Sequence, residues 1–507
     1  MSISIAQPLV GLLDRWIDAL LDEKRGDRVV ALSLIVYAAA WTVYRIVATL
    51  PRDIHVDMAE VYGWSRELAF GYEKHPPLSA AIVRTWFTAI PVSDVTFTLL
   101  ATVNIALALY LIWRICRLYM PRDRSAFGIA LLTLVPFFNF HALKYNANSV
   151  MLPLWAATTY FFLLAYQSLR WQPALFAGVM AGASILGKYW SIFLVAGLGL
   201  AAIIDRRRDR FFRSWTPWII AAACLVVLAP HLDWLRQSGF SSLVYARARI
   251  VSAEPLFWLN DAAFLLEALG YASAPIVLAI VLLHPRGDAL KDMLWPHDDQ
   301  RRLAAKVFAL PLLLPALASA VFGLMLTPLW TLPNWSLLPV VLLSSPKVEV
   351  TRHALRAGLA VASLLTLGAL ALSPLIAVLL HLYAQPRAEQ YAATVASRAL
   401  AQWQQATNRP LRFVAGDIAL GVSVAYYLDK QTRYIGIDPH RARNLFAFRG
   451  GVFVCPADDP RCLVAGEHAA DGLPAARVEM TATRALFGIP GPSLRYVLTM
   501  VPPSDKR

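Results

Sequence analysis

Residues 53–78, DIHVDMAEVYGWSRELAFGYEKHPPL, gather carboxylates, histidines and a lysine in a chain that is 58% hydrophobic. Asp57 and Glu60 are three residues apart, so they share one face if this stretch is helical. An aspartate at a membrane interface can act as a base toward a hydroxyl acceptor. Toward a group that is already anionic, Asp57 would instead orient a cation or a neighbouring hydroxyl group. A solvated loop acid or a helix cap is the alternative interpretation of Asp57.

The apolar residues of this stretch predict how it folds. The spacing of Val61, Trp64 and Leu68 favours a helix over residues 57–70 with one apolar stripe. Such a helix would lie on the membrane and present its acids above the lipid.

The composition of the chain indicates a membrane protein. Only 16% of its 507 residues are charged, whereas soluble domains carry about 25%. The formal net charge of +14 arises from short basic clusters between apolar runs, where membrane topology explains them better than nucleic acid does. We therefore expect contact with a membrane and none with nucleic acid.

Apolar runs predict the architecture, because a helix needs about 20 mostly apolar residues to cross a bilayer. We expect an α-helical polytopic membrane protein with about eleven spans in residues 29–385, preceded by an amphipathic segment over residues 1–28. The spans are predicted near 29–50, 96–116, 125–141, 148–167, 173–187, 189–204, 216–235, 262–284, 305–327, 329–345 and 355–383.

Basic residues predict the orientation of these spans, since Lys and Arg accumulate in short cytoplasmic loops. With the N-terminus inside, RICRLYMPRDR, QSLRWQ, DRRRDRFFR, HPRGDALKDMLWPHDDQRR and SPKVEVTRHALR all fall inside. The loop 51–95 and the tail after residue 384 are then external.

The tail, residues 386–507, is predicted to be a small soluble α/β domain with βαβ character. Strand-like runs occur at LRFVAG, TRYIGI, GVFVC, ARVEMTAT and LRYVLTMV, and helical patterns at 387–406 and 417–428. Cys455 and Cys462 bracket a short loop in this external domain, so we expect a disulfide, with two free thiols as the alternative.

The external loop resembles the first loop of the GT-C glycosyltransferases. It is most similar to the protein O-mannosyltransferase-like branch, glycosyltransferase family 39, which includes bacterial aminoarabinose transferases that modify lipid A. The resemblance covers roughly residues 29–345, and the residues that carry it are Asp57, Glu60, Tyr72, Lys74, His75, Pro76 and Pro77.

This resemblance implies transfer of a sugar from a polyprenyl phosphate to an acceptor at the outer membrane face. It assigns the catalytic role to Asp57, and Glu60 is a further catalytic candidate because it lies three residues later in the same stretch. It assigns the donor phosphate to Lys74 with Tyr72, since Tyr72-Glu73-Lys74 matches the Tyr-Glu-Lys of the aminoarabinose branch, with His75 inserted before the prolines. The loop HALKYNANSV departs from the family because it has no acid.

Further residues are candidates for the same site. A departing polyprenyl phosphate is an anion that needs positive charge, which a basic side chain at the membrane edge can supply. Additional candidates for the phosphate are Lys144, Lys188, Arg247 and Arg249, and candidates for substrate contact are His55, His75 and Asn146. Two histidines with scattered acids form no recognisable metal site, so we expect no metal and no cofactor.

The predicted function is glycosyl transfer at the periplasmic face of the bacterial inner membrane, with lipid A, lipopolysaccharide or another lipid or glycan as acceptor. A protein O-glycosyltransferase is the alternative within the same reaction class. A lipid-linked sugar flippase is a third hypothesis, but transporters usually show repeated halves and mid-span charges. Here the acids concentrate in the first external loop instead.

Overall fold

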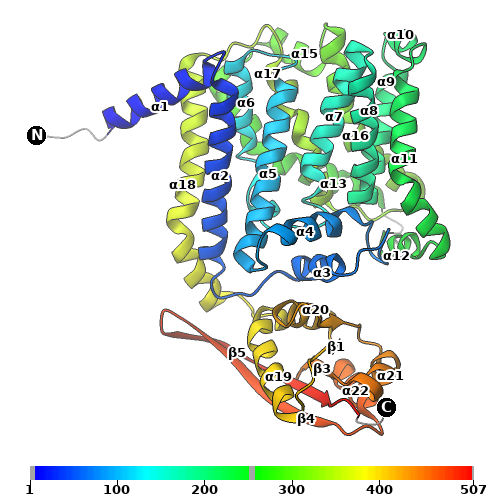
Figure 1. Cartoon of the computed structure of the whole chain (residues 1–507). Helices are drawn as coiled ribbons and strands as arrows, with labels where there is room; N and C mark the ends of the chain where they lie inside the picture. Colours follow the sequence, from blue (N-terminus) through cyan, green and yellow to red (C-terminus); the bar gives the residue numbers. More distant parts are fainter. Residues whose placement is uncertain (1–5, 251–256, 505–507) are drawn as a thin grey trace, which may run out of the picture. The chain divides into compact units, whose positions relative to one another are not determined.

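The structure is a computed structural model that describes residues 6–250 and 257–504 (Figure 1). The chain divides into two compact units. Unit 1 comprises residues 1–42, 69–79 and 99–370, and unit 2 comprises residues 43–68, 80–98 and 371–507. The end of helix α2, the beginning of α5 and the end of α18 are thus counted with unit 2.

Unit 1 is built from helices, most of which lie side by side (Figure 1). Its helices are α1 (Ala6–Leu21), α2 (Gly26–Ala48), α5 (Asp94–Cys116), α6 (Arg122–Leu132), η1 (Pro136–Phe138), η2 (Phe140–Ala142), α7 (Met151–Ser168), α8 (Trp171–Gly187), η3 (Tyr189–Ser191), α9 (Ile192–Ile203), α10 (Arg208–Phe212), α11 (Thr216–Gln237), α12 (Ser241–Ile250), α13 (Phe257–Tyr271), α14 (Ser273–Leu283), α15 (Gly287–Leu294), α16 (Asp299–Phe322), η4 (Pro328–Leu337), α17 (Leu338–Leu343) and α18 (Arg352–Tyr383).

Five described helices are long and apolar enough to cross a membrane: α2, α5, α11, α16 and α18. Two bent pairs raise the number to seven if each is one span, namely α6 with η1 and η2, bent by 90°, and α13 with α14, bent by 53°. By length and composition the described chain thus offers five to seven candidate spans, beside the eleven that the apolar runs predict. The other segments do form helices, but they are short: α8 has 17 residues, at the lower end of the roughly 17–25 that a span needs, and α9 has 12.

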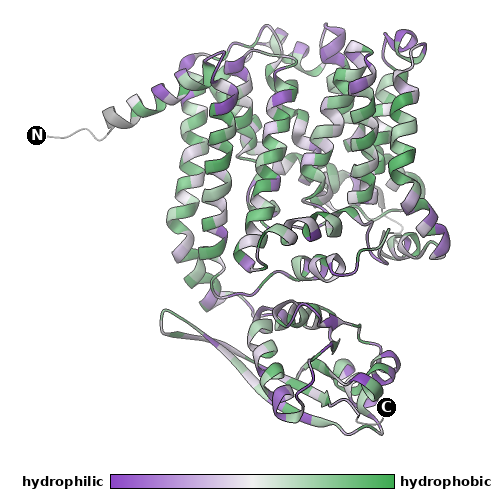
Figure 2. Ribbon diagram, viewed as in Figure 1, coloured by the Kyte–Doolittle hydropathy of each residue, from purple (hydrophilic) through white to green (hydrophobic). Residues whose placement is uncertain are grey.

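The long helices are hydrophobic along most of their length (Figure 2). On α2, Ile35 and Val36 are 62% and 68% exposed, and on α18 Leu364 is 72% exposed. Water would penalise so much apolar surface, whereas hydrocarbon does not. These faces are suited to contact with lipid.

Unit 2 contains a mixed sheet with helices on both faces. Its strands are β1 (Phe413–Gly416), β2 (Arg433–Tyr434), β3 (Gly451–Pro456), β4 (Ala476–Leu486) and β5 (Ile489–Val501), and its helices are α3 (Val56–Ser65), α4 (Leu78–Ala89), η5 (Ala388–Tyr391), α19 (Ala392–Ala406), α20 (Ile418–Tyr427), α21 (Pro439–Arg449) and α22 (Pro460–Ala470). The five strands follow the order β2-β1-β3-β5-β4. β1 pairs in parallel with β2 and β3, while β5 is antiparallel to β3 and β4.

The pleat of the central strands divides the core of this sheet into two layers, because successive side chains point to opposite faces. Val414 and Val452 pack with α19 and α20 on one face. Phe453 and Cys455 pack with α21 and α22 on the other. The expected α/β domain with βαβ character is confirmed, although α21 and α22 were not predicted.

Cys455 and Cys462 are joined by a disulfide that links β3 to α22, with Cα atoms 5.6 Å apart. The sequence pattern led us to expect this bond. Both residues are buried in the core layer beside α21 and α22.

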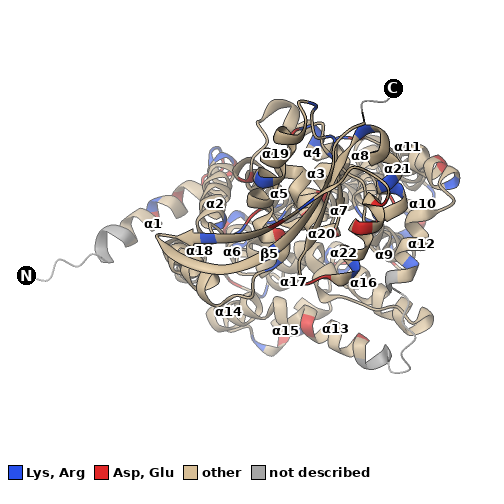
Figure 3. Cartoon of the chain, turned by 90° about the horizontal axis from the view of Figure 1, so that it is seen from below, with Lys and Arg blue, Asp and Glu red and all other residues tan. Residues whose placement is uncertain are grey.

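Acidic and basic residues are interspersed over the elements of unit 2 (Figure 3).

Candidate active site

The acids of the first loop lie on a short helix of unit 2, α3. His55 is its N-cap, and its Nδ1 accepts the backbone N–H of Asp57 at 3.1 Å. Because Nδ1 accepts this bond, it carries no proton, and its 3.8 Å separation from Asp57 Oδ2 is not an ion pair. The positive end of the helix dipole favours the carboxylate of Asp57 in the first turn.

Asp57 and Glu60 share the half-buried face of α3, as their spacing predicted. Met58, Ala59 and Val61 are buried. Tyr62 packs edge-on against Tyr426 of α20, with ring centroids 5.1 Å apart. One face of α3 therefore fixes the helix within unit 2, while the Asp57 side chain remains 32% exposed.

The predicted helix over 57–70 is too long. α3 ends at Ser65, where Arg66 caps it by donating its backbone N–H to Gly63 and Trp64 carbonyls. Val61 is buried, and Leu68, which is 55% exposed, lies beyond the helix. Consequently the expected apolar stripe does not form, because Val61 packs into the protein and Leu68 follows the last turn.

The residues before α3 are anchored by contacts that sequence reasoning missed. Asp53 pairs with Arg484 of β4 and accepts the backbone N–H of Ala393 at 2.7 Å. Burial raises the pKa of the Asp53 carboxyl, although the charge of Arg484 opposes this effect. Tyr427 accepts the N–H of Ile54 at 2.8 Å and donates to Asp94 Oδ2 at 2.6 Å. No local signal predicts these pairs, since Asp53 and Arg484 are 431 positions apart.

The segment 69–79, which carries Lys74, belongs to unit 1. Tyr72 donates its backbone N–H to the carbonyl of His75 at 3.0 Å, so residues 72–75 form a tight turn with Glu73 and Lys74 at its tip. Gly71 packs so closely on Trp234 that a Cβ atom would lie 2.3 Å from the indole ring. A larger residue at this position would displace the turn.

His231 of α11 holds the same segment through a chain of hydrogen bonds. Its Nδ1 is 2.5 Å from the carbonyl oxygen of Phe70, and its Nε2 is 2.9 Å from the Tyr189 hydroxyl. Since a carbonyl only accepts, Nδ1 donates and the neutral ring accepts from Tyr189 at Nε2. Tyr189 in turn accepts from Ser242 of α12 at 2.6 Å. The turn that carries Lys74 is thereby tied to η3, α11 and α12.

Lys188, which directly precedes Tyr189, is held next to the loop before α7. Its ammonium contacts Asn148 Oδ1 and lies 4.7 Å from the ring centroid of Trp330. Asn146 Oδ1 accepts the backbone N–H groups of Asn148 and Ser149 at 2.9 and 3.0 Å. This geometry gives Asn146 a role in shaping the loop, in addition to the substrate contact expected for it.

The structure thus brings several predicted phosphate ligands toward the same elements of unit 1. Lys144 lies half-buried in the loop of Asn146, and Lys188 contacts that loop. Arg247 is exposed on α12, five residues after Ser242. The side chain of Arg249 lies outside the described residues. His55, Asp57 and Glu60 belong to unit 2 and are described there.

No group of three or more His, Cys, Asp or Glu side chains able to hold a metal ion occurs in the described part of the chain. Lys74, Lys144, Lys188 and Arg247 are hydrogen-bond donors and point charges. Such groups can stabilise an anionic leaving group without a metal.

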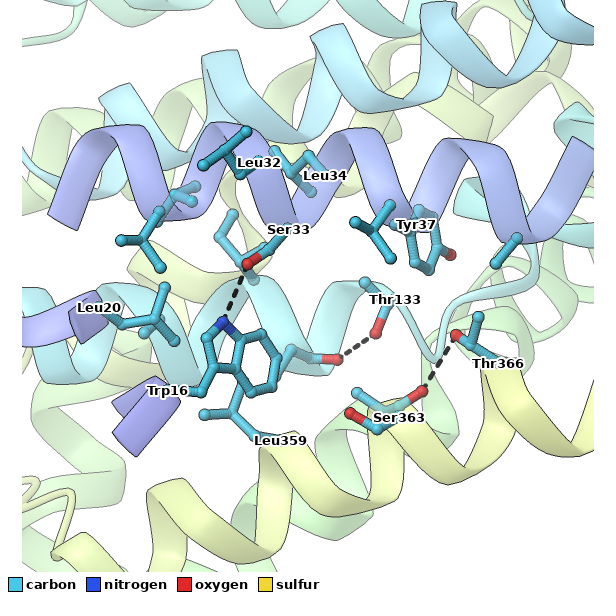
Figure 4. Close-up of a pocket in the computed structure, with 18 of the residues that line it drawn as sticks. Trp16, Leu20, Leu32, Ser33, Leu34, Tyr37, Thr133, Leu359, Ser363 and Thr366 are labelled. Carbon is cyan, nitrogen blue, oxygen red and sulfur yellow. Dashed lines mark hydrogen bonds between the residues drawn. The ribbon is translucent and has the colours of Figure 1, made fainter. Parts of the chain in front are cut away.

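A cavity of about 540 Å³ lies elsewhere in unit 1, between α1, α2, α6 and α18 (Figure 4). Several of its hydroxyl groups are engaged: Ser33 accepts from Trp16 at 2.9 Å, and Thr133 and Thr366 donate to carbonyls of their own helices. The described lining includes none of the predicted site residues. This cavity suits a hydrocarbon chain better than a sugar.

Comparison with known protein families supports the resemblance found in the loop. Residues 74–234 match the family described as dolichyl-phosphate-mannose-protein mannosyltransferase. The matched segment begins at Lys74 and contains Lys144, Asn146 and Lys188, whereas Asp57 and Glu60 precede it.

One curated relative is the lipopolysaccharide core galacturonosyltransferase RgtB of Rhizobium johnstonii, which is 30% identical over 237 residues. The alignment covers 45% of this chain and 45% of RgtB, so it spans less than half of either protein.

Two solved structures resemble the whole fold. ArnT from Cupriavidus metallidurans bound to undecaprenyl phosphate gives a TM-score of 0.61 at 12% identity, covering 92% of this chain and 97% of ArnT. Its apo form gives 0.58 at 11% identity, covering 97% and 98%. The chain therefore has the GT-C fold of ArnT and is a multi-pass membrane protein, as expected from its sequence.

Proposed function

We propose that this chain is a membrane glycosyltransferase that takes a sugar from a polyprenyl-phosphate donor and transfers it to an envelope lipid or glycan. One observation carries the proposal. The segment that matches the mannosyltransferase family contains Lys74 and Lys188, and hydrogen bonds of His231 to Phe70 and Tyr189 tie the Lys74 turn to the neighbourhood of Lys188. The ArnT fold supports a lipid-linked donor, because ArnT has been solved with undecaprenyl phosphate.

The chemistry of the leaving group explains the need for these lysines. When a polyprenyl phosphate leaves the anomeric carbon, negative charge develops on its oxygen, and a nearby cation stabilises that charge. Lys74 is the proposed principal contact, with Tyr72 beside it and with Lys144, Lys188 and Arg247 as further sources of charge. Lysine suits this role because it supplies a compact point charge.

Asp57 is proposed to act on the acceptor side of the reaction. A half-exposed carboxylate at a helix start can take a proton from an acceptor hydroxyl as the new bond forms. Glu60, one turn later on the same face, is the proposed second acid. His55 orders the first turn of α3, and His75 ends the Lys74 turn, so both are proposed to contact the substrate from these positions.

We place this chemistry on the periplasmic face of the bacterial inner membrane, with the domain of residues 386–507 on the same side. The distribution of Lys and Arg among the loops supports this orientation. The Cys455–Cys462 disulfide also supports it, since such bonds persist in oxidising compartments.

The acceptor is proposed to be lipopolysaccharide or a related lipid or glycan, which the partial match to RgtB favours. Protein is the second candidate acceptor, because the matching family is described as protein mannosyltransferase. Mass spectrometry of a deletion strain distinguishes the two. We expect the strain to lack one sugar on its lipopolysaccharide or another envelope glycan, and the wild-type gene to restore it.

Loss of sugar from periplasmic proteins alone would favour the protein acceptor. An unchanged envelope and unchanged proteins would contradict transfer altogether. Lipid-linked sugar that accumulates only on the cytoplasmic face would instead indicate a flippase.

A further inference from the structure

Unit 2 contains a pocket of about 190 Å³ where α2 ends and α5 begins. Its lining combines charged side chains, including Arg45, Arg52 and Asp94, with apolar ones such as Leu50 and Val95. His55, a proposed substrate contact, belongs to this lining, whereas the proposed donor-phosphate residues are not among its described residues.

Most polar groups of the pocket already have partners. Asp53 is held by Arg484 and Ala393, and Asp94 accepts the Tyr427 hydroxyl at 2.6 Å. Thr49, which follows α2, and Thr98 of α5 each donate to the backbone carbonyl four residues earlier, at 2.7 and 2.8 Å. These groups need no ligand to satisfy them.

The guanidinium groups of Arg45 and Arg52 are different. Among the described residues, neither side chain has a hydrogen-bond or ion-pair partner. Burial lowers the pKa of Arg52, and the positive charge of Arg387 lowers it further. Arginine nevertheless stays protonated and offers only donors, so the pocket presents positive charge that an anion would neutralise. Asp94 opposes part of that charge, whereas Asp53, the other carboxylate of the lining, is paired with Arg484, and Glu389, whose charge also acts on Arg52, is paired with Arg387.

The position of the pocket identifies the anion. α2 and α5 are both long enough to cross the membrane, so the end of one and the start of the other lie at headgroup level. Leu50 and Val95 are 49% and 47% exposed beside the arginines. Positive charge next to exposed apolar side chains at this depth matches a lipid that carries phosphate on its headgroup.

We propose that Arg45 and Arg52 bind the phosphate of a membrane lipid headgroup. The planar guanidinium groups match phosphate oxygens in bidentate geometry, which a lysine pair would not reproduce. This site is assembled from residues other than those proposed to hold the sugar donor. Its test is a binding measurement without donor, so its outcome is independent of the proposed function.

The experiment uses full-length protein, delipidated in a neutral maltoside detergent and titrated with phosphatidylglycerol under native mass spectrometry. We expect wild-type protein to bind phosphatidylglycerol, and diacylglycerol, which lacks phosphate, not to compete. In Arg45→Gln/Arg52→Gln the affinity should fall about tenfold or more, the scale for lost hydrogen bonds to a charged group. Arg398→Gln is the matched control, because Arg398 is exposed on α19 and lies outside the pocket lining.

Equal affinity of the double variant and wild type would overturn the proposal. Equally strong binding of inorganic phosphate would overturn the assignment to a lipid and indicate a soluble anion. Arg45→Lys/Arg52→Lys guards against misfolding, since it keeps the charges. It should melt like wild type without lipid and bind phosphatidylglycerol more tightly than the glutamine variant does.

Discussion

Asp57 combines the two properties that a catalytic carboxylate in this loop requires. It is fixed in the first turn of a helix whose other face is buried. Its side chain is still 32% exposed, so an acceptor can reach it. Asp57→Asn keeps the size of this side chain and most of its capacity for hydrogen bonds, and removes its charge. A substitution at Asp57 therefore tests chemistry more than stability.

We predict that Asp57→Asn lowers turnover by about 10²-fold or more, the scale of a general base, because it keeps the size but removes the charge. Glu60→Gln should have a smaller effect. Sugar transfer is measured in membranes with a lipid-linked donor, at protein levels matched by immunoblot. Near-normal transfer by Asp57→Asn would remove the catalytic role while leaving the fold unaffected.

For Lys74 the expected effect is on the donor. Lys74→Ala should raise the donor concentration needed for half-maximal transfer at least tenfold, because a charge-assisted contact of about 1.5–3 kcal/mol is lost. Lys74→Arg should retain part of this affinity, since it keeps the charge. If Lys74→Ala shows wild-type dependence on donor, Lys144, Lys188 or Arg247 becomes the better candidate.

The sequence allowed prediction of side chains whose role depends on type and local spacing, such as Asp57 with Glu60. It did not allow prediction of Asp53 with Arg484 or Ile54 with Tyr427, because these partners are 431 and 373 positions apart. The His231 relay was missed for a similar reason, since Phe70 and His231 are 161 positions apart. In these cases tertiary packing decides the partners.

At the scale of elements, the junction between α15 and α16 is fixed by a buried carboxylate. Asp292 accepts from Arg301 at 2.8 Å and from Ser345 at 2.6 Å, and it also accepts the backbone N–H of His297. Burial by itself would raise the pKa of Asp292, but the hydrogen bonds from Ser345 and Arg301 outweigh it and lower the pKa to about 2. The ionised form therefore ties α15 to α16 and to the segment after α17.

This lowered pKa predicts a pH dependence of stability. The folded state binds the proton less tightly than the unfolded state, whose ordinary value is 3.8, so the stabilisation is present above about pH 4 and lost as the pH falls toward 2. The difference corresponds to about 2 kcal/mol. Thermal unfolding in detergent should show wild type losing its advantage over Asp292→Asn between pH 4 and 2. A difference that stays constant across this range would contradict the assignment.

The predicted helix boundaries agree with the structure where apolar runs are long, as in α5 and α18. They differ where tertiary packing interrupts an apolar run. The predicted span 125–141 is broken by a 90° bend between α6 and the 3₁₀ turns that begin at Pro136. α3 stopped at Ser65 although the apolar spacing continued. The spacing of apolar residues indicates which face of a helix is apolar, but the residue at which the helix ends depends on tertiary contacts.

At the scale of the whole molecule, the distribution of basic residues predicts on which side of the membrane each loop and the tail lie. Reporter fusions after residue 384 should give a periplasmic signal, and fusions within 205–213 a cytoplasmic one, because DRRRDRFFR is a basic loop. A cytoplasmic signal after residue 384 would contradict the orientation and the proposed location of the chemistry.

The central claim is that sugar moves from a polyprenyl phosphate to an envelope acceptor on this protein. Purified full-length protein in liposomes, supplied with polyprenyl-phosphate-linked radiolabelled sugar and with lipopolysaccharide from the deletion strain, tests it directly. We predict label on the lipopolysaccharide with wild-type protein and about 10²-fold less with Asp57→Asn. Label that crosses the bilayer while still attached to the polyprenyl phosphate, with none on any acceptor, would contradict the account.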